Sequence, residues 1–72
     1  MRIEIYGRPN CAYCNAAVSL CKQKKLEYKY YEVDKDFTVE ELFEKVPFKT
    51  YPQIFINDAT IGGYNEFLQV ML

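Results

Sequence analysis

The sequence has 72 residues, half of them apolar and 17% aromatic, which is typical of a small globular domain and excludes a disordered tail. Nine basic and ten acidic residues give a net charge of −1 without a block of like charges, so we expect no binding to nucleic acid or to a membrane surface. No segment reaches the ~20 apolar residues of a membrane span, and the N-terminus lacks the features of a secretory signal, so we expect one domain, residues 1–72, in the cytoplasm.

The first half of the chain predicts a strand, a helix and a second strand. Residues 2–6 alternate apolar and polar side chains, and residues 7–10 contain the Gly, Pro and Asn of a loop. Residues 12–25 favour a helix with lysines in its last turns, where cations complement the helix dipole. Its apolar face consists of Cys14, Ala17, Val18 and Cys21. Residues 28–33 are rich in aromatic side chains and predict the second strand.

The second half predicts a helix, a hairpin and a final helix. Thr38 and Glu41 form a capping box that begins the helix, and Pro47 ends it. The apolar stripe of this helix consists of Val39, Leu42, Phe43 and Val46. Residues 53–56 and 59–62 predict two short strands that pair through a tight turn at 57–58. The final helix begins at Tyr64 or Asn65 and runs to the C-terminus, with an apolar face made of Tyr64, Phe67, Leu68 and Met71.

The elements therefore follow the order β-α-β-α-β-β-α, which predicts an α/β fold. The first β-α-β unit should place its two strands in parallel through a right-handed crossover. The closing hairpin should add antiparallel strands to the same sheet. We expect a small mixed sheet with helices packed on its faces.

The loop "GRPNCAYC" at 7–14 contains the residues with the most chemical potential. Cys11 falls where the loop becomes the helix, and the free N–H groups and positive dipole end of a helix stabilise a thiolate there. Arg8 can add a positive charge. Cys14 lies one turn further into the helix and should be more shielded. We expect Cys11 to be the exposed attacking nucleophile and Cys14 to be the resolving thiol that closes a disulfide with it.

Other interpretations of the cysteines compete with this redox pair. The chain has three cysteines and no histidine, so it supplies fewer than the four ligands of a closed zinc site, and we expect no metal. A zinc site shared by two chains stays open as an alternative. A purely structural disulfide would close a very short loop and restrain little chain entropy. Cys21 lies on the apolar face of the helix and should pack as a small core side chain.

Three separated motifs resemble those of glutaredoxins: "YGR..C.YC" at 6–14, "TYPQIFI" at 50–56 and "IGGYNEF" at 61–67. The resemblance covers nearly the whole chain and is closest to the small bacterial or phage type. It implies a thioredoxin-like fold with a four-stranded mixed sheet flanked by helices. It also implies glutathione-dependent reduction of protein disulfides and protein–glutathione mixed disulfides, with Cys11 and Cys14 as the catalytic residues.

The resemblance also implies a glutathione site. Tyr51–Pro52 should be a cis bond that exposes the backbone N–H and C=O of Tyr51 to the cysteinyl part of glutathione, as in strand addition. Thr50 flanks this position and is an expected contact. The three residues expected to hold the γ-glutamyl group, close to the start of the final helix, are Gly63, Tyr64 and Asn65. Arg8 would face the glycine carboxylate, and Tyr13 would form the near wall of the groove.

The sequence departs from the family pattern at two positions of this site. Ala12 stands where the family often has proline after the first cysteine, so the family's reduction potential is not carried over to this chain. Asn65 stands where relatives often have an aspartate, and Glu66 could supply the missing charge.

Two further functions remain open at this stage. A thioredoxin-like electron donor, serving for example ribonucleotide reductase and recharged by a reductase, would use the same cysteine pair. A glutathione-assisted iron–sulfur carrier is the other, because Ala12 removes the proline of the motif. For the leading function we expect glutathione as a co-substrate without a tightly bound cofactor. The expected partners are disulfide or glutathionylated proteins, and the protein should act as a monomer.

Overall fold

The computed structural model describes all 72 residues, and its elements follow the predicted order. They are β1 (Ile3–Gly7), α1 (Ala12–Gln23), β2 (Tyr28–Glu32), α2 (Val39–Phe43), β3 (Gln53–Ile56), β4 (Ala59–Gly62) and α3 (Tyr64–Met71). Two predicted helix ends are wrong. The first helix stops before Lys25, whose φ of 56° turns the chain out of the helix. The second stops at Phe43, several residues before Pro47.

The four strands form one mixed sheet in the order β2-β1-β3-β4, which confirms the predicted topology. β1 and β2 are parallel, with Ile5 opposite Tyr30, and β3 lies antiparallel on the other side of β1. β3 and β4 form the expected hairpin. Its turn residues Asn57 and Asp58 have φ values of 51° and 70°, a left-handed conformation that Asn and Asp tolerate better than most residues.

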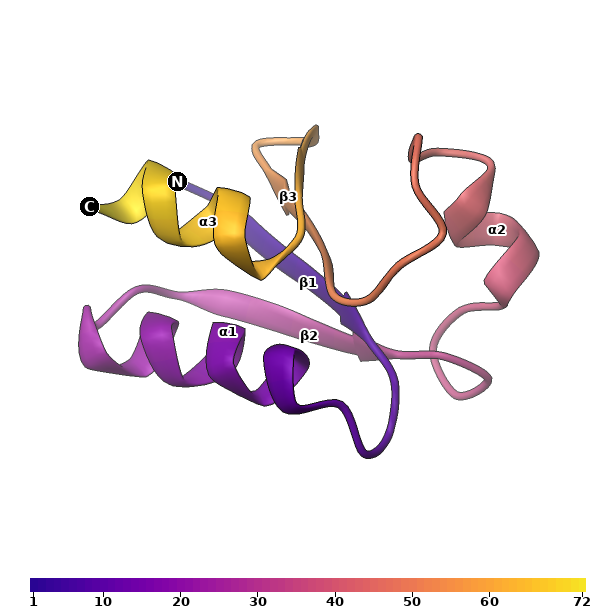
Figure 1. Ribbon diagram of the computed structural model, residues 1–72, viewed down its shortest axis with the longest axis horizontal. Helices are drawn as coiled ribbons and strands as arrows, with labels where there is room; N and C mark the ends of the chain where they lie inside the picture. Colours follow the sequence, from indigo (N-terminus) through magenta and orange to yellow (C-terminus); the bar gives the residue numbers. More distant parts are fainter.

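The larger core lies between the sheet and two helices, α1 and α3. Ile3 and Ile5 are buried on the same face of β1, as the alternation in this strand predicts. The other buried members of this core are Ala17, Leu20, Cys21, Ile54 and Phe67. Figure 1 shows α1 and α3 running along the strands, and these two helices also contact each other. This packing fixes the position of the N-terminal end of α1.

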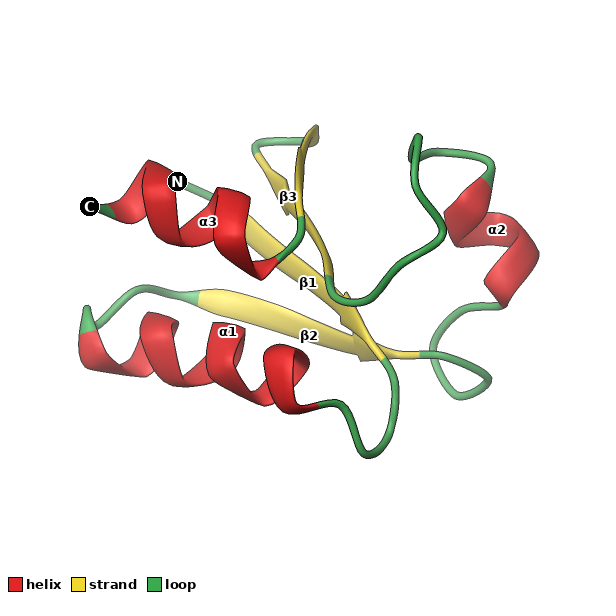
Figure 2. Ribbon diagram, viewed as in Figure 1, coloured by secondary structure: helices red, strands yellow, loops and turns green.

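A smaller core lies on the other side of the sheet, where α2 packs. Phe37, Leu42 and Val46 are its buried residues. Tyr6, the neighbour of Ile5 in β1, points to this side and has its ring centroid 5.1 Å from that of Phe37. α2 is short and is joined to β3 by a long loop, drawn in green in Figure 2. None of the helices is long and apolar enough to cross a membrane.

Candidate functional site

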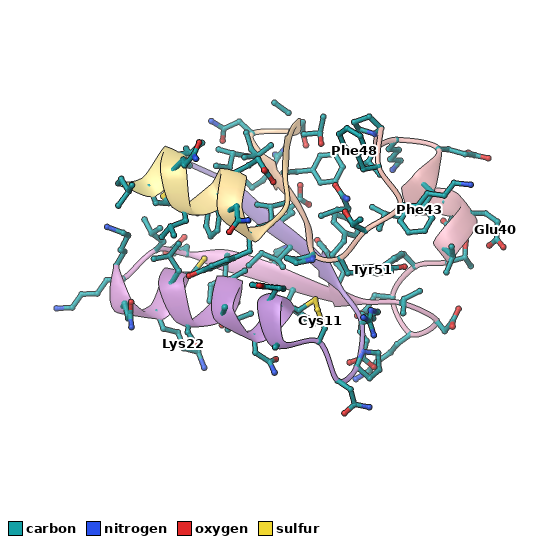
Figure 3. The ribbon with its side chains drawn as sticks, viewed as in Figure 1. Cys11, Lys22, Glu40, Phe43, Phe48 and Tyr51 are labelled. Carbon is teal, nitrogen blue, oxygen red and sulfur yellow. A yellow bond between two sulfur atoms is a disulfide. The ribbon has the colours of Figure 1, made fainter.

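Cys11 and Cys14 form a disulfide at the N-terminal end of α1. Figure 3 shows the yellow sulfur–sulfur bond at this end of the helix. Cys11 is the N-cap residue, with φ −117° and ψ 107°, and its Sγ accepts a hydrogen bond from the backbone N–H of Cys14 at 3.2 Å. This confirms that Cys11 lies where the loop becomes the helix. The helix N-terminus therefore has a hydrogen bond ready for negative charge on the Cys11 sulfur.

The prediction that the Cys11 side chain is exposed is wrong for the disulfide form that the structure contains. Cys11 is only 6% exposed, because its sulfur is bonded to that of Cys14, which is completely buried. The order of the two is as predicted, with Cys14 the more shielded. Cys21 is confirmed as a core residue, and burial raises the pKa of its thiol.

A pocket of about 180 Å³ contains most of the residues expected to bind glutathione. The Tyr51–Pro52 bond is cis, as expected. Tyr13, between the two cysteines in the sequence, is 62% exposed, and its ring is stacked on that of Tyr64 with centroids 5.9 Å apart. The residues that line the pocket are Tyr13, Tyr51, Pro52, Gly63, Tyr64, Asn65 and Glu66. The structure thus brings Tyr13 together with residues 51–52 and 63–66, which lie far from it in the chain.

Arg8 lies outside the lining of this pocket but contacts one of its walls. Its guanidinium carbon is 6.0 Å from the centroid of the Tyr51 ring, at the limit of a cation–π contact. Phe43 of α2 also lies beside this ring, at 5.5 Å between centroids. The hydroxyl of Tyr51 is buried without a hydrogen-bond partner, and burial raises its pKa. Arg8 therefore lies close to the Tyr51 end of the pocket.

Sequence and structural comparisons both point to one family. The sequence model described as Glutaredoxin matches residues 3–61. A glutaredoxin of Haemophilus influenzae is 37% identical, over 99% of this chain and 91% of the relative. The chain belongs to the glutaredoxin family. With the Cys11–Cys14 pair, this membership supports thiol–disulfide oxidoreductase activity.

Solved glutaredoxin structures have the same fold. Reduced Escherichia coli glutaredoxin superposes with a TM-score of 0.75 at 33% identity, over 99% of this chain and 93% of the other. A buckwheat glutaredoxin in complex with glutathione has a TM-score of 0.85 at 23% identity, covering 96% of this chain and 66% of the buckwheat chain. At this identity the buckwheat structure shows the shared thioredoxin-like fold alone.

In this glutaredoxin Thr50 does not line the pocket that contains Tyr51. Its carbonyl oxygen and its hydroxyl both accept hydrogen bonds from Nε2 of Gln53, and it lines a separate pocket of about 440 Å³. Sequence reasoning missed the role of Gln53, which is 2% exposed. The only signal was a polar residue at the start of an otherwise apolar strand, "QIFI".

Glu66 has a structural role that the sequence did not reveal. Its Oε1 accepts a hydrogen bond from the backbone N–H of Gly63 at 2.8 Å and so caps α3. One carboxylate oxygen at this end of the pocket is therefore engaged within the protein. The residue with a left-handed backbone here is Gly62, with φ 122°, whereas Gly63 is extended.

The structure brings together no group of three His, Cys, Asp or Glu side chains that could hold a metal ion.

Proposed function

We propose that this glutaredoxin is a glutathione-dependent thiol–disulfide oxidoreductase that reduces protein disulfides and protein–glutathione mixed disulfides. The observation that carries the proposal is the Cys11–Cys14 disulfide at the N-terminus of α1, with Tyr13 lining the adjoining pocket. The fold positions a sulfur where negative charge is stabilised. A second thiol one helical turn away can trap the intermediate.

The proposed reaction begins with the reduced pair. The Cys11 thiolate attacks a substrate disulfide, one substrate sulfur leaves as a thiolate and takes a proton, and a mixed disulfide forms on Cys11. Cys14 then attacks the Cys11 sulfur, loses its proton, releases the second substrate thiol and forms the disulfide present in the structure. With a glutathionylated substrate, a second glutathione can instead attack the glutathione bound to Cys11 and leave as glutathione disulfide.

Reducing the Cys11–Cys14 disulfide back to two thiols takes two glutathione molecules. The first, as a thiolate, attacks the Cys11 sulfur, which breaks the Cys11–Cys14 bond and leaves Cys14 to take a proton. The second attacks the sulfur of the bound glutathione, which frees the Cys11 thiolate and forms glutathione disulfide. The two electrons that reduce the protein disulfide thus come from two glutathione thiols.

The charges and free N–H groups around the pocket suit a peptide with two carboxylates. Arg8, near the Tyr51 ring, would bind the glycine carboxylate. The backbone N–H groups of Tyr64 and Asn65 begin α3 and have no partner within the helix, so they would bind the γ-glutamyl carboxylate. The backbone of Tyr51 would pair with the cysteinyl residue between them. Thr50 is proposed as a contact only through its backbone N–H, since its carbonyl oxygen and its hydroxyl both accept hydrogen bonds from Gln53.

We propose disulfide and glutathionylated proteins, with ribonucleotide reductase among the candidates, as the partners of a monomeric cytoplasmic enzyme. A thiol pair that cycles through glutathione requires a compartment that supplies reduced glutathione. The buckwheat glutaredoxin of the same fold was crystallised with glutathione, which supports this choice of co-substrate.

The decisive experiment titrates the oxidised protein with glutathione and identifies products by mass spectrometry. We expect a transient glutathione adduct on Cys11 of the natural protein. Cys14→Ser cannot form the internal disulfide, so it is treated with glutathione disulfide instead, which should leave a stable glutathione adduct on Cys11 and release one glutathione. Cys14→Ser should keep deglutathionylation activity and lose dithiol reduction of protein disulfides, whereas Cys11→Ser should lose both. Reduction by a thioredoxin reductase but not by glutathione would instead favour the electron-donor function.

A second experiment tests recognition of glutathione itself. Arg8→Gln should slow regeneration by glutathione but not by 2-mercaptoethanol, which has no carboxylate, and should raise KM more than it lowers kcat. Lys29→Gln, at an exposed position on β2, is the matched control. Equal effects of Arg8→Gln with both thiols would contradict the proposed contact.

A further inference from the structure

Cys14 must exchange a proton although it has no exposed surface. In the exchange proposed above, on which this inference rests, Cys14 loses a proton when it attacks Cys11 and gains one when the disulfide opens. Its side chain is 0% exposed. Water therefore does not reach the sulfur directly, and a protein group must lie between the two.

The hydroxyl of Tyr30 and the sulfur of Cys14 both lie close to the Cα of Gly7, on the side where a side chain would be. Tyr30 lies opposite Ile5 in the parallel pair of β2 and β1, so its side chain reaches along the strand face that α1 covers. A Cβ built on Gly7 would overlap the Tyr30 hydroxyl and would lie 2.7 Å from its Cζ and 3.1 Å from Sγ of Cys14. The hydroxyl and the sulfur thus border the same space, which exists because residue 7 has no side chain.

The same tyrosine also reaches solvent. It lines a pocket of about 490 Å³ between α1 and β2, which shares no lining residue with the proposed glutathione pocket. The polar residues of this pocket are Arg8, Asn10, Asn15, Ser19, Lys22 and Glu32. Figure 3 shows Lys22 on α1, the helix that begins at the cysteine pair. Arg8 is the one residue of this pocket that is also proposed to bind glutathione. Water between the rest of α1 and β2 can therefore meet the Tyr30 side chain without passing the substrate.

We propose that the Tyr30 hydroxyl relays protons between Cys14 and water in the α1–β2 pocket. When Cys14 attacks, its proton passes to the hydroxyl oxygen of Tyr30 while the hydroxyl proton passes to water. The bond between the Cys11 sulfur and the substrate sulfur breaks, the Cys11–Cys14 bond forms, and the substrate leaves as a thiolate. When the disulfide is reduced, the same steps run in reverse and protonate Cys14.

The protonation of the Tyr30 hydroxyl fits this role. Burial raises the pKa of its phenol, and Glu32 adds to the shift, so the hydroxyl keeps its proton near neutral pH. The charged groups around the route are Arg8 before α1, Lys22 on α1 and Glu32 on β2. On α3 the titratable groups near the pair are Tyr64 and Glu66, which line the opposite pocket.

The test follows the two thiols separately with one equivalent of 4,4′-dithiodipyridine added to the reduced protein. Attack by Cys11 releases one thiopyridone, and attack by Cys14 on the resulting mixed disulfide releases the second, so absorbance shows two phases. Tyr30→Phe should slow the second phase by about tenfold or more and move its pH midpoint upward, because no hydroxyl then takes the proton of Cys14 or lies near its thiolate. The first phase should not change.

Tyr28→Phe is the matched control, since Tyr28 lines the same pocket two residues earlier on β2, roughly 6.6 Å away along the strand. It should leave both phases unchanged.

A second phase in Tyr30→Phe with the natural rate and pH midpoint would overturn the relay and leave the proposed function intact. Slowing of both phases, or equal slowing by Tyr28→Phe, would show a structural role and also overturn it. A natural protein without a second phase would contradict the proposed function instead.

Discussion

The side-chain nitrogen Nε2 of Gln53 donates to both the carbonyl oxygen of Thr50, at 2.8 Å, and its hydroxyl, at 3.1 Å. The same nitrogen reaches the carbonyl oxygen of Phe48 at 3.0 Å. Gln53 is buried and follows the cis Tyr51–Pro52 bond directly. Its amide therefore holds the loop that leads into one wall of the proposed glutathione pocket.

Gln53→Glu should lower the free energy of unfolding by about 2–4 kcal/mol at neutral pH, because a buried carboxylate would face three hydrogen-bond acceptors. Gln53→Met, which loses the hydrogen bonds without adding charge, should cost less, about 1–3 kcal/mol. Denaturant unfolding at several pH values measures both. Gln53→Glu should regain stability in acid, where the protonated carboxyl can donate. An equal loss at acidic and neutral pH would argue against this arrangement.

Gly7 should tolerate no side chain. Its Cβ would overlap the Tyr30 hydroxyl, and buried overpacking costs about 1–3 kcal/mol, so Gly7→Ala should destabilise the protein by at least that amount. Gly63→Ala is the control, because its Cβ would lie 3.4 Å from the nearest atom, Oε1 of Glu66, in ordinary contact. Thermal unfolding compares the two. If Gly7→Ala cost no more than Gly63→Ala, the close approach at Gly7 would be disproved.

Cys21 should be inert in the folded, reduced protein. It is completely buried and its thiol pKa is raised by burial, so iodoacetamide should modify it on the order of a hundredfold more slowly than Cys11 near neutral pH. Peptide mapping after timed alkylation measures this ratio. Cys21→Ser should lower the free energy of unfolding by about 1–3 kcal/mol through a buried hydroxyl without a partner, and Cys21→Ala by about 1 kcal/mol. Comparable alkylation rates would contradict the burial.

The capping box of α2 should lose its contribution in acid. Hydrogen bonds from Thr38, first from its backbone N–H, lower the pKa of Glu41 below its ordinary value of 4.5. The unfolded chain therefore binds the proton more readily, so this stabilisation is present above pH 4.5 and disappears as the pH falls through the lower folded pKa.

Glu41→Gln keeps an oxygen that can accept the same bond but does not titrate. Its free energy of unfolding should therefore fall less steeply in acid than that of the natural protein. Glu40→Gln, also in the first turn of α2 but without a bond to Thr38, should leave the acid slope unchanged. Guanidinium unfolding at a series of acidic pH values measures how the free energy of unfolding of the two variants and of the natural protein depends on pH. An identical slope in all three proteins would rule out the cap as a source of the pH dependence.

The elements predicted best are those fixed by neighbouring residues. The strands at 53–56 and 59–62 have the expected bounds, since two turn residues that tolerate positive φ separate two short apolar runs. Cys11 was placed correctly at the helix start, because Gly, Pro and Asn end the preceding structure and Ala12 begins a helical pattern. The resemblance also identified most of the residues that line the pocket containing Tyr13 and Tyr51.

The sequence by itself determined the order of strands and helices and the position of a thiol pair at a helix N-terminus, because periodicity, turn residues and caps act over a few residues. Tertiary structure alone decided that the ring of Tyr13 stacks on that of Tyr64 and that Tyr30 and Cys14 border the same space beside Gly7. These features arise where segments distant in the chain pack together, and the side chains that meet there leave no periodic mark on either segment.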